Sequence, residues 1–377
     1  MATKSKRQTP QIADTADLGE RKPLSHVVLL SDETTVPPAA DALALIREIE
    51  QIRQSRVITL FSNPEVLLAG DIPLALYRQL RAIGRVERID LFLHACGGAT
   101  EVPWRIITLI RGFCRHFSVL VPYRAYSSAT HIAMGADEII MGDMSELGPT
   151  DPARTHPLLP KDGDRQLFIS VQDLRQCIEF IKREAAGEDG KRQQTPEAWA
   201  TIYSALFEKV HPLALGAIEQ SYALARLISE KALSTHFDPV GEKDKIARIV
   251  SVFSDEFFSH RYNIGWKEAS ELGLPVRFTD DDLWDRMWQL YEHYAAYQEV
   301  VRPVDDRTRT IGRPVVWIDS GDHRQVLEER YHLRESKGKR EEQSLEPSLP
   351  PQWMTMKWEE TDLQDSQPTT FEAREQG

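Results

Sequence analysis

The stretch "RIDLFLHACGGAT" (Arg88–Thr100) joins an apolar run to a pair of glycines. The apolar part predicts a buried β-strand. Glycines weaken a strand and do not favour a helix, so the strand should end at Gly97–Gly98. A glycine pair in this place is often only a turn. However, without side chains to crowd them, its backbone N–H groups could also bind an oxyanion or a phosphate.

The sequence around this stretch repeats a strand-and-helix order. Apolar, β-branched runs predict strands at 56–62, 88–95, 118–123 and 137–142. A helical pattern precedes the second strand and ends at Gly84, and Ile106, Ile110 and Phe117 belong to an amphipathic pattern over 102–117. This alternation predicts an α/β fold built from βαβ units with a mainly parallel sheet.

The two ends of the chain differ from this middle part. Residues 1–25 are polar and lack periodicity, which predicts a disordered lead before a domain at 26–280. Helical patterns dominate from Ser170, and we expect residues 281–333 to form a helical C-terminal extension with one late strand in "RPVVWID" (Arg313–Asp319). The charged, proline-dotted residues 334–377 predict a disordered tail.

Composition and charge limit the partners and cofactors that the protein can be expected to have. The chain has 377 residues and a formal net charge of −12, which argues against nucleic acid or an anionic membrane as partner. No apolar run is long enough to span a bilayer, and no signal-peptide pattern opens the chain. Cys96, Cys114 and Cys177 form neither a metal-type cluster nor a disulfide framework, so we expect a cytoplasmic protein with no metal and no cofactor.

Three polar segments follow predicted strands, and in α/β sheets functional groups gather at such strand ends. They read "HACGGAT", "PYRAYSSAT" and "MSELGPTDP". Ser127 opens a short helix of small residues, where the helix dipole and the Ser128 N–H would favour developing negative charge. A helix-opening serine is more often a simple N-cap. Together with the glycine pair, however, it suggests acyl transfer, with Ser127 as nucleophile.

The strings "DLFLHACGGATEVPWRIITLIR", "VLVPYRAYSSATHIAMGADEIIMGDMSELGPTDP" and "HRYNIGWKEASELGLPV" resemble the serine dehydrogenase proteinase (SDH) family. This is a ClpP-like branch of the serine peptidases, related to signal peptide peptidase A. The resemblance covers roughly residues 50–276 and implies a ClpP/crotonase-like fold, a peptide or protein substrate and a homo-oligomer in rings or stacks. The family usually has Thr-Pro-Gly-Gly where this chain has Ala95–Gly98, and Ser-Gly-Gly where it has Ser127–Ala129.

The resemblance also implies a catalytic triad in the chain order Ser, Asp, His. It assigns the base to His260, which precedes the "NI…EASELGLPV" segment. For the acid we choose Asp151 in "LGPTDP", with Asp255 as a second candidate. Gly97, Gly98 and Ser128 would supply the oxyanion hole.

Other residues could carry chemistry, but each has a simpler explanation. His131, four residues after Ser127, is more often a packed core histidine. Cys96 beside His94 is more often a small buried residue than a nucleophile. Lys182, the candidate for a Ser-Lys dyad, lies on an amphipathic helix where lysines are usually solvated. Two alternatives to a peptidase remain: a crotonase-type acyl-CoA enzyme, and an inactive scaffold or assembly protein.

Overall fold

The computed structural model describes residues 28–29, 39–154, 156–159, 161–162, 165–166, 169–186, 195–257, 259–298, 300–305, 310–321, 323–335 and 343–357. The predicted disordered lead, residues 1–25, lies outside these ranges. The end of the predicted tail, residues 358–377, also lies outside them.

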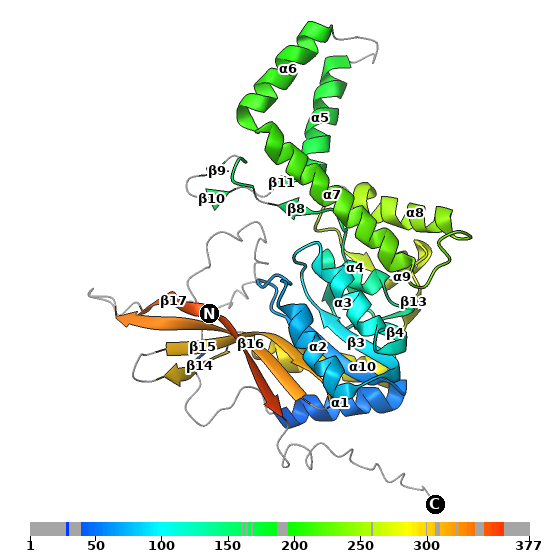
Figure 1. Cartoon of the computed structure of the whole chain (residues 1–377), viewed down its shortest axis with the longest axis vertical. Coiled ribbons are helices and arrows are strands. Elements are labelled where there is room, and N and C mark those ends of the chain that lie inside the picture. Colours follow the sequence, from blue (N-terminus) through cyan, green and yellow to red (C-terminus); the bar gives the residue numbers. More distant parts are fainter. Residues whose placement is uncertain are drawn as a thin grey trace, which may run out of the picture.

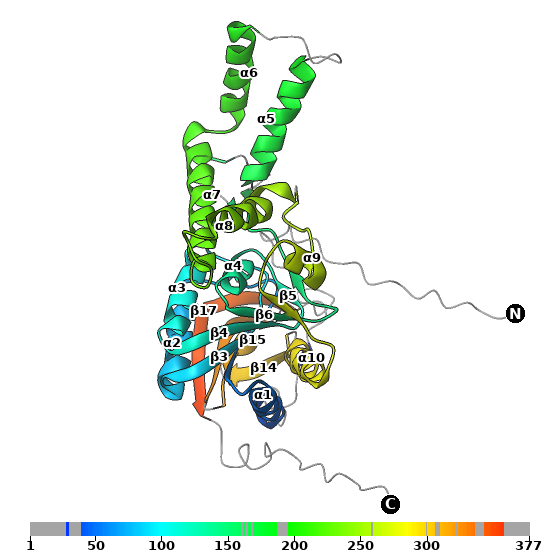
Figure 2. The ribbon, with the colours of Figure 1, turned by 90° about the vertical axis from the view of Figure 1, so that its right-hand side faces the viewer.

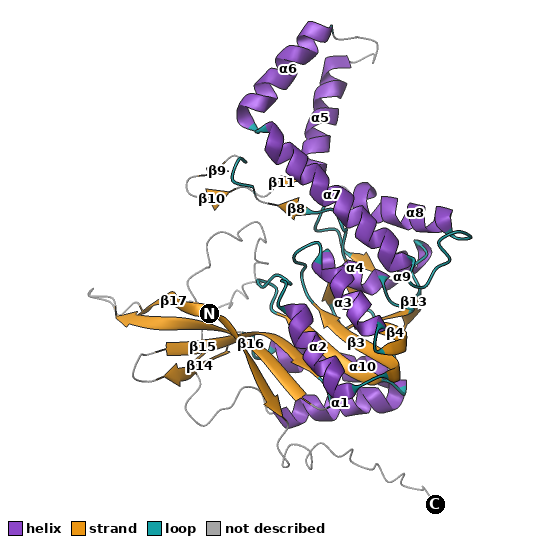
Figure 3. Ribbon diagram, in the orientation of Figure 1, coloured by secondary structure: helices purple, strands orange, loops and turns teal. Residues whose placement is uncertain are grey.

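A block of parallel strands forms one end of a large sheet (Figure 3). These strands lie side by side in chain order: β2 (Arg56–Ser62), β3 (Val86–His94), β4 (Cys114–Val121) and β6 (Glu138–Met141), with β13 (Val276–Phe278) parallel to β6. The helices between them are α2 (Ile72–Ile83), α3 (Val102–Arg111) and α4 (Ser128–Met134). The predicted α/β fold is therefore confirmed.

Successive side chains of a strand point to opposite faces of the sheet. Helices cover both faces of β2, β3, β4 and β6, so alternate residues of these strands belong to two different cores. On β2, Ile58 and Leu60 join the core under α2, α3 and α4. Val57 and Phe61 join the core under α1 (Ala39–Arg53) and α10 (Asp282–Ala295). Figure 2 shows α2 and α3 on one side of the strands and α10 on the other.

The predicted helix over 102–117 is too long, because α3 ends at Arg111 and β4 begins at Cys114. Backbone bonds to neighbouring strand segments replace helix bonds here: the Val86 N–H donates to the Phe113 carbonyl at 2.9 Å, and the Asp137 N–H donates to the Phe117 carbonyl at 2.7 Å. Cys114 and Phe117 fit both a helical and a strand pattern, so periodicity alone placed them wrongly.

The predicted helical extension at 281–333 is also wrong beyond its first helix. After α10 the chain forms four strands: β14 (Val300–Asp305), β15 (Thr310–Asp319), β16 (His323–Glu335) and β17 (Gln343–Lys357). β15 contains the predicted late strand and pairs antiparallel with β2, and β14 also pairs with β1 (Val28–Leu29). β17 pairs with β16 inside the predicted disordered tail. Charged side chains make β16 hard to recognise as a strand from the sequence. Some of them are nevertheless buried and paired: the Arg324 side chain, 2% exposed, bonds Asp319 at 2.8 Å.

Three long helices form an arm, which comprises α5 (Val171–Ala186), α6 (Pro196–Lys209) and α7 (Pro212–Leu233). Figure 1 shows α5 and α6 reaching away from the sheet, while α7 returns to α4. α6 contributes no buried residue, so the outer part of the arm has little core of its own. No helix among the described residues is long and apolar enough to cross a membrane.

Short elements lie between the sheet and the arm. They are the three-stranded sheet of β5 (Arg124–Ala125), β7 (Glu146–Leu147) and β12 (Ile264–Gly265); the strand pairs β8 (Ala153–Arg154) with β11 (Ile169–Ser170) and β9 (Lys161–Asp162) with β10 (Arg165–Gln166); and the helices α8 (Lys243–Ser251), η1 (Val252–Glu256, a π-helix) and α9 (Trp266–Glu271).

Candidate active site

The glycine pair after β3 is required by two close approaches. A Cβ on Gly98 would lie 2.3 Å from the Leu68 carbonyl oxygen, because the segment at Leu68 pairs directly with it. Gly97 has a φ of +114°, which L side chains rarely adopt, and a Cβ there would lie 3.0 Å from the Ser127 Cβ. The glycines therefore let one loop contact Leu68 on one side and Ser127 on the other.

Ser127 stands at the start of α4 in a strained conformation. Its φ of +52° and ψ of −114° are unusual for a residue with a side chain. Its side chain makes no capping hydrogen bond, so the simple N-cap explanation does not hold. An ideal Cβ on Gly97 would be 3.4 Å from the Ser127 Oγ, which places the hydroxyl against the glycine loop. This resembles the sharp strand-to-helix turns that present nucleophilic serines.

Two backbone N–H groups are available beside this hydroxyl. The Leu68 N–H donates to the Gly97 carbonyl and the Ala99 N–H donates to the Leu68 carbonyl, each at 2.9 Å. Among the described residues, the N–H of Gly98 itself has no acceptor. Ser128 opens α4, so its N–H has no partner within the helix. The Ser128 Oγ donates to the Gly98 carbonyl at 2.7 Å and so ties the two loops together.

His260 and Asp151 form a pair although they are far apart in the sequence. The His260 Nδ1 lies 2.9 Å from the Asp151 Oδ1. The Asp151 side chain is 5% exposed and the His260 side chain is 38% exposed. A carboxylate on Nδ1 holds the imidazole in the tautomer that leaves Nε2 free to accept a proton.

The small sheet of β5, β7 and β12 brings the three candidate residues to one end. Leu147 of β7 pairs with Ile264 of β12 in antiparallel register. Asp151 lies four residues after Leu147 and His260 four residues before Ile264, so the two face each other where this register continues. β5 runs parallel to β7, and Ser127 follows it by two residues at the same end.

Side chains that the sequence analysis did not single out hold this arrangement together. The Tyr126 hydroxyl donates to the Glu146 carboxylate and, at 3.0 Å, to the Asn263 side chain. The Thr130 Oγ1 donates to the Gly148 carbonyl at 2.9 Å and accepts from the Gly148 N–H at 3.1 Å. These bonds connect the serine loop to the segments that lead to Asp151 and His260. The sequence signal was weak, because each residue is an ordinary polar side chain outside any motif.

The alternative candidates occupy other environments. The Asp255 carboxylate is bonded by Arg175 at 2.8 Å and by Arg226 at 2.7 Å. Asp151, rather than Asp255, is therefore the carboxylate on His260. The exposed Lys182 pairs with Glu179 at 2.7 Å on its own helix.

Burial shifts the pKa values of His131, His94 and Cys96. Burial lowers the pKa of His131 to about 4, and its Nε2 lies 3.1 Å from the Ala225 carbonyl oxygen of α7. Burial likewise lowers the pKa of His94 to about 3, with a smaller effect from the Arg124 charge. Burial raises the pKa of Cys96 to about 11, which keeps the thiol protonated at neutral pH and unsuited to nucleophilic attack.

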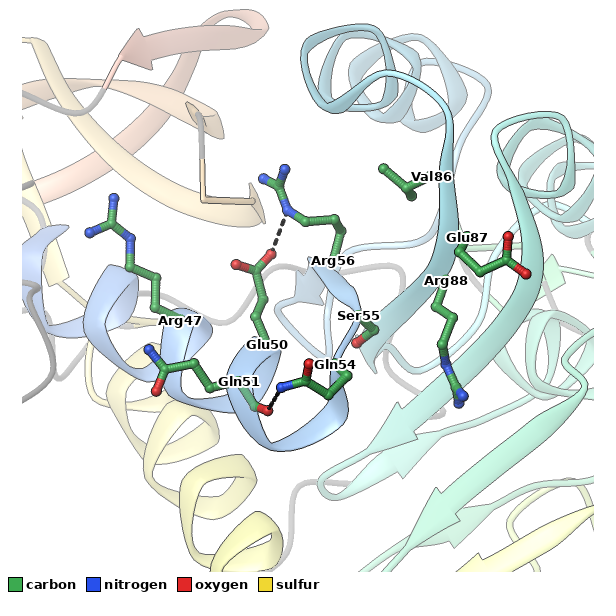
Figure 4. Close-up of a pocket in the computed structure, with 9 residues that line it drawn as sticks. All are labelled: Arg47, Glu50, Gln51, Gln54, Ser55, Arg56, Val86, Glu87 and Arg88. Atoms are coloured by element: carbon green, nitrogen blue, oxygen red, sulfur yellow. Dashed lines mark hydrogen bonds and ion pairs between the residues drawn. The ribbon is translucent and has the colours of Figure 1, made fainter.

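A large hollow lies away from these groups (Figure 4). It measures about 580 Å³ and is lined at the C-terminal end of α1 and the amino ends of β2 and β3, whereas Ser127 belongs to the carboxyl ends of the strands. Arg56 bonds Glu50 across it at 2.9 Å, and Arg88 points away from this pair. Asp151 borders only a packing gap that is too small to hold a water molecule. Within the described ranges, no group of three His, Cys, Asp or Glu side chains is placed to hold a metal ion.

Comparison with solved structures gives only distant likenesses. A substitution mutant of the 1510-N membrane-bound stomatin-specific protease is 13% identical, covering 56% of this chain and 73% of that chain, with a TM-score of 0.32. A methylmalonyl CoA decarboxylase is 16% identical, covering 47% of this chain and 86% of that chain, with a TM-score of 0.20. At these TM-scores neither likeness bears on the fold or the function of this chain.

Sequence comparison is more specific. The chain is 25% identical over 262 residues to the uncharacterized protein MJ0137 of Methanocaldococcus jannaschii, covering 67% of this chain and 78% of that protein. It is 32% identical over 243 residues to the uncharacterized protein MJ1495 of the same organism, covering 56% of this chain and 82% of that protein. Residues 36–158, which include the glycine pair, Ser127 and Asp151, match the family model described as ClpP-like SDH-type serine proteinase. The chain belongs to this family of serine proteinases.

Proposed function

We propose that this protein hydrolyses peptide bonds through an acyl-enzyme formed on Ser127. The observation that carries the proposal is the Asp151–His260 pair, 2.9 Å apart, at the same end of the small sheet as Ser127. A serine hydroxyl is a weak nucleophile until a base takes its proton, and an imidazole oriented by a carboxylate is such a base.

In the proposed reaction, the His260 Nε2 takes the proton of the Ser127 hydroxyl while Oγ attacks the carbonyl carbon of the peptide. The N–H groups of Gly98 and Ser128 stabilise the oxyanion that forms, and Gly97 keeps their loop against Ser127. His260 then gives its proton to the leaving amine, and the peptide C–N bond breaks. The same imidazole then takes a proton from a water molecule, which attacks the ester carbonyl; the bond to the Ser127 Oγ breaks, Oγ takes the proton back from His260, and the acid is released. Asp151 stabilises the imidazolium throughout.

The departures from the usual family pattern are compatible with this chemistry. Ser128 stands where the family usually has glycine, and its Oγ bonds the Gly98 carbonyl at 2.7 Å instead of occupying the site. The protonated thiol of Cys96 does not compete as a nucleophile. A peptide or protein substrate, a homo-oligomer and a cytoplasmic location complete the proposal. The free thiols of Cys96, Cys114 and Cys177 support a reducing compartment.

Labelling of the full-length protein with a fluorophosphonate probe tests the proposal. We expect the probe to modify Ser127, and the Ser127→Ala variant to remain unlabelled. Ser204→Ala, at an exposed position on α6, is the matched control and should label normally. A native protein that is folded but unlabelled would instead favour a scaffold or a crotonase-type acyl-CoA enzyme. A coenzyme A binding measurement separates these two.

A further inference from the structure

We propose that Asp255 is a positioning residue for the Asp151–His260 pair, through which the helical arm sets the geometry of the site. This inference rests on the proposed function, because it concerns the same triad. Asp255 touches neither Ser127 nor the glycine loop among the contacts of the described residues. It acts through η1, a π-helix, and such helices are frequent at functional sites.

Asp255 binds the arm from two helices. Its Oδ1 accepts from Arg175 of α5 at 2.8 Å and from the Tyr222 hydroxyl of α7, and its Oδ2 accepts from Arg226 of α7 at 2.7 Å. Its backbone carbonyl accepts from the Gln172 side chain of α5 at 2.5 Å. Hydrogen bonds between ionised groups are shorter and stronger than neutral ones, so Asp255 is the main polar connection from η1 to the arm.

η1 and the residue after it in turn contact the segments that carry the two members of the pair. On one side, the Phe253 carbonyl accepts from the Thr150 N–H at 2.8 Å, which fixes the residue next to Asp151. On the other side, the Phe257 ring, which directly follows η1, stacks on Tyr262 at 4.7 Å between ring centroids. Tyr262 is two residues beyond His260. A shift of η1 would therefore move the carboxylate and the imidazole relative to each other.

The arm has a second attachment beside Asp151. Ser170 at the base of α5 pairs with Ala153, two residues after Asp151. Asp173 caps this end of the helix, and its carboxylate accepts from the Ser170 N–H and from the Ser170 hydroxyl at 2.9 Å each. Gln172 borders the same packing gap as Asp151 and Ser259, which is too small to hold a water molecule. The segment that carries Asp151 is thus held between β11 and η1, and the arm contacts both β11 and η1.

His260 needs such support, because its side chain is 38% exposed and is not fixed by burial. Small displacements of catalytic groups slow a reaction strongly, since about 1 Å of misplacement can lower the rate on the order of 100-fold. Replacing Asp255 by asparagine keeps its shape and removes the charge that binds Arg175 and Arg226. The expected consequence is a slower chemical step with unchanged substrate binding.

The test uses full-length Asp255→Asn, Arg175→Gln and Arg226→Gln, with Arg183→Gln as the control on α5, where the side chain is largely exposed. Fluorophosphonate labelling rates, and kcat and KM on a peptide substrate, are measured for each, together with thermal unfolding. For Asp255→Asn we expect kcat and the labelling rate to fall on the order of tenfold, with KM changed less than about twofold. The two arginine variants should show smaller losses of the same kind, and Arg183→Gln none.

The outcomes separate the two proposals. If native protein labels at Ser127 but Asp255→Asn and both arginine variants keep kcat within about twofold, the positioning role is overturned and the peptidase proposal stands. The positioning role also fails if kcat falls only in proportion to the unfolded fraction seen by thermal unfolding. If native protein is not labelled at Ser127, the peptidase proposal fails, and this inference fails with it.

Discussion

Around Ser127 the chain is buried, whereas residues 259–263 around His260 are exposed. Every residue of α4, which Ser127 opens, is buried, while the His260 side chain is 38% exposed. We call residues 95–98 and 125–134 the serine half of the site, and residues 150–151, 252–257 and 259–263 the histidine half. The groups of the serine half lie within or beside the glycine pair and the segment that begins at Ser127, both of which stand out in the sequence. The histidine half depends on contacts between segments about a hundred residues apart.

This difference predicts how each half fails. A substitution in the histidine half that keeps the volume of the side chain, such as aspartate to asparagine, should reduce activity with little effect on folding, because the packing around it is retained. A substitution in the serine half should reduce activity and stability together, since its loops are packed against the sheet. The predictions below test this contrast.

The largest effect is expected for Asp151→Asn in the histidine half. The amide cannot stabilise the imidazolium and can favour the wrong imidazole tautomer, so kcat should fall by about 10³- to 10⁴-fold. Steady-state kinetics and urea unfolding measure the two properties, and Asp143→Asn, at an exposed position, is the control. A loss of less than about tenfold would mean that Asp151 is not the triad acid.

Gly98→Ala should break the serine half. The new Cβ would lie 2.3 Å from the Leu68 carbonyl oxygen, and this backbone can move only by disturbing the loop. We expect the labelling rate of Ser127 to fall at least about tenfold and the unfolding free energy to fall by about 1–3 kcal/mol. Gly70→Ala is the matched control, because a Cβ there meets no atom within 4 Å. Equal behaviour of the two variants would contradict the close-packing explanation.

The same contrast explains how much the sequence could predict. The strand at β3, the glycine pair and Ser127 follow from local patterns, and the structure brings them together. The choice between Asp151 and Asp255 did not follow from local patterns. Asp255 precedes His260 by five residues and so stayed a second candidate, and only the folded chain shows Arg175 and Arg226 on it. Of the C-terminal strands only part of β15 was predicted. The charged Arg324 interrupts the apolar pattern of β16, although the folded chain buries it against Asp319.

A pH effect on stability tests the burial of the serine half. His131 has a folded-state pKa lowered to about 4, so its neutral form is favoured in the fold. As pH falls below about 6.5, the unfolded chain binds a proton that the folded protein does not, and stability declines until the folded pKa is reached. Between pH 7.5 and 5, His131 should cost about 2 kcal/mol.

Urea unfolding at these two pH values compares native protein with His131→Gln. The glutamine keeps a donor toward the Ala225 carbonyl but does not titrate. The variant should therefore lose less stability on acidification, by about the amount that His131 contributes. Equal losses in both proteins would show that His131 takes up its proton as readily in the fold as in the unfolded chain.

The smallest effect is expected at Ser128, where this chain has a hydroxyl in place of the usual family glycine. Its Oγ donates to the Gly98 carbonyl at 2.7 Å, and the residue is 2% exposed. Ser128→Ala removes this bond without adding backbone freedom, so the unfolding free energy should fall by about 1 kcal/mol. Ser128→Gly removes the same bond and also loosens the first turn of α4, so it should cost about 0.5–1 kcal/mol more. Labelling of Ser127 should slow only about two- to fivefold in either variant, because the Ser128 N–H remains in place. A Ser128→Ala variant as stable as the native protein would mean that the two loops are held together by their backbones alone.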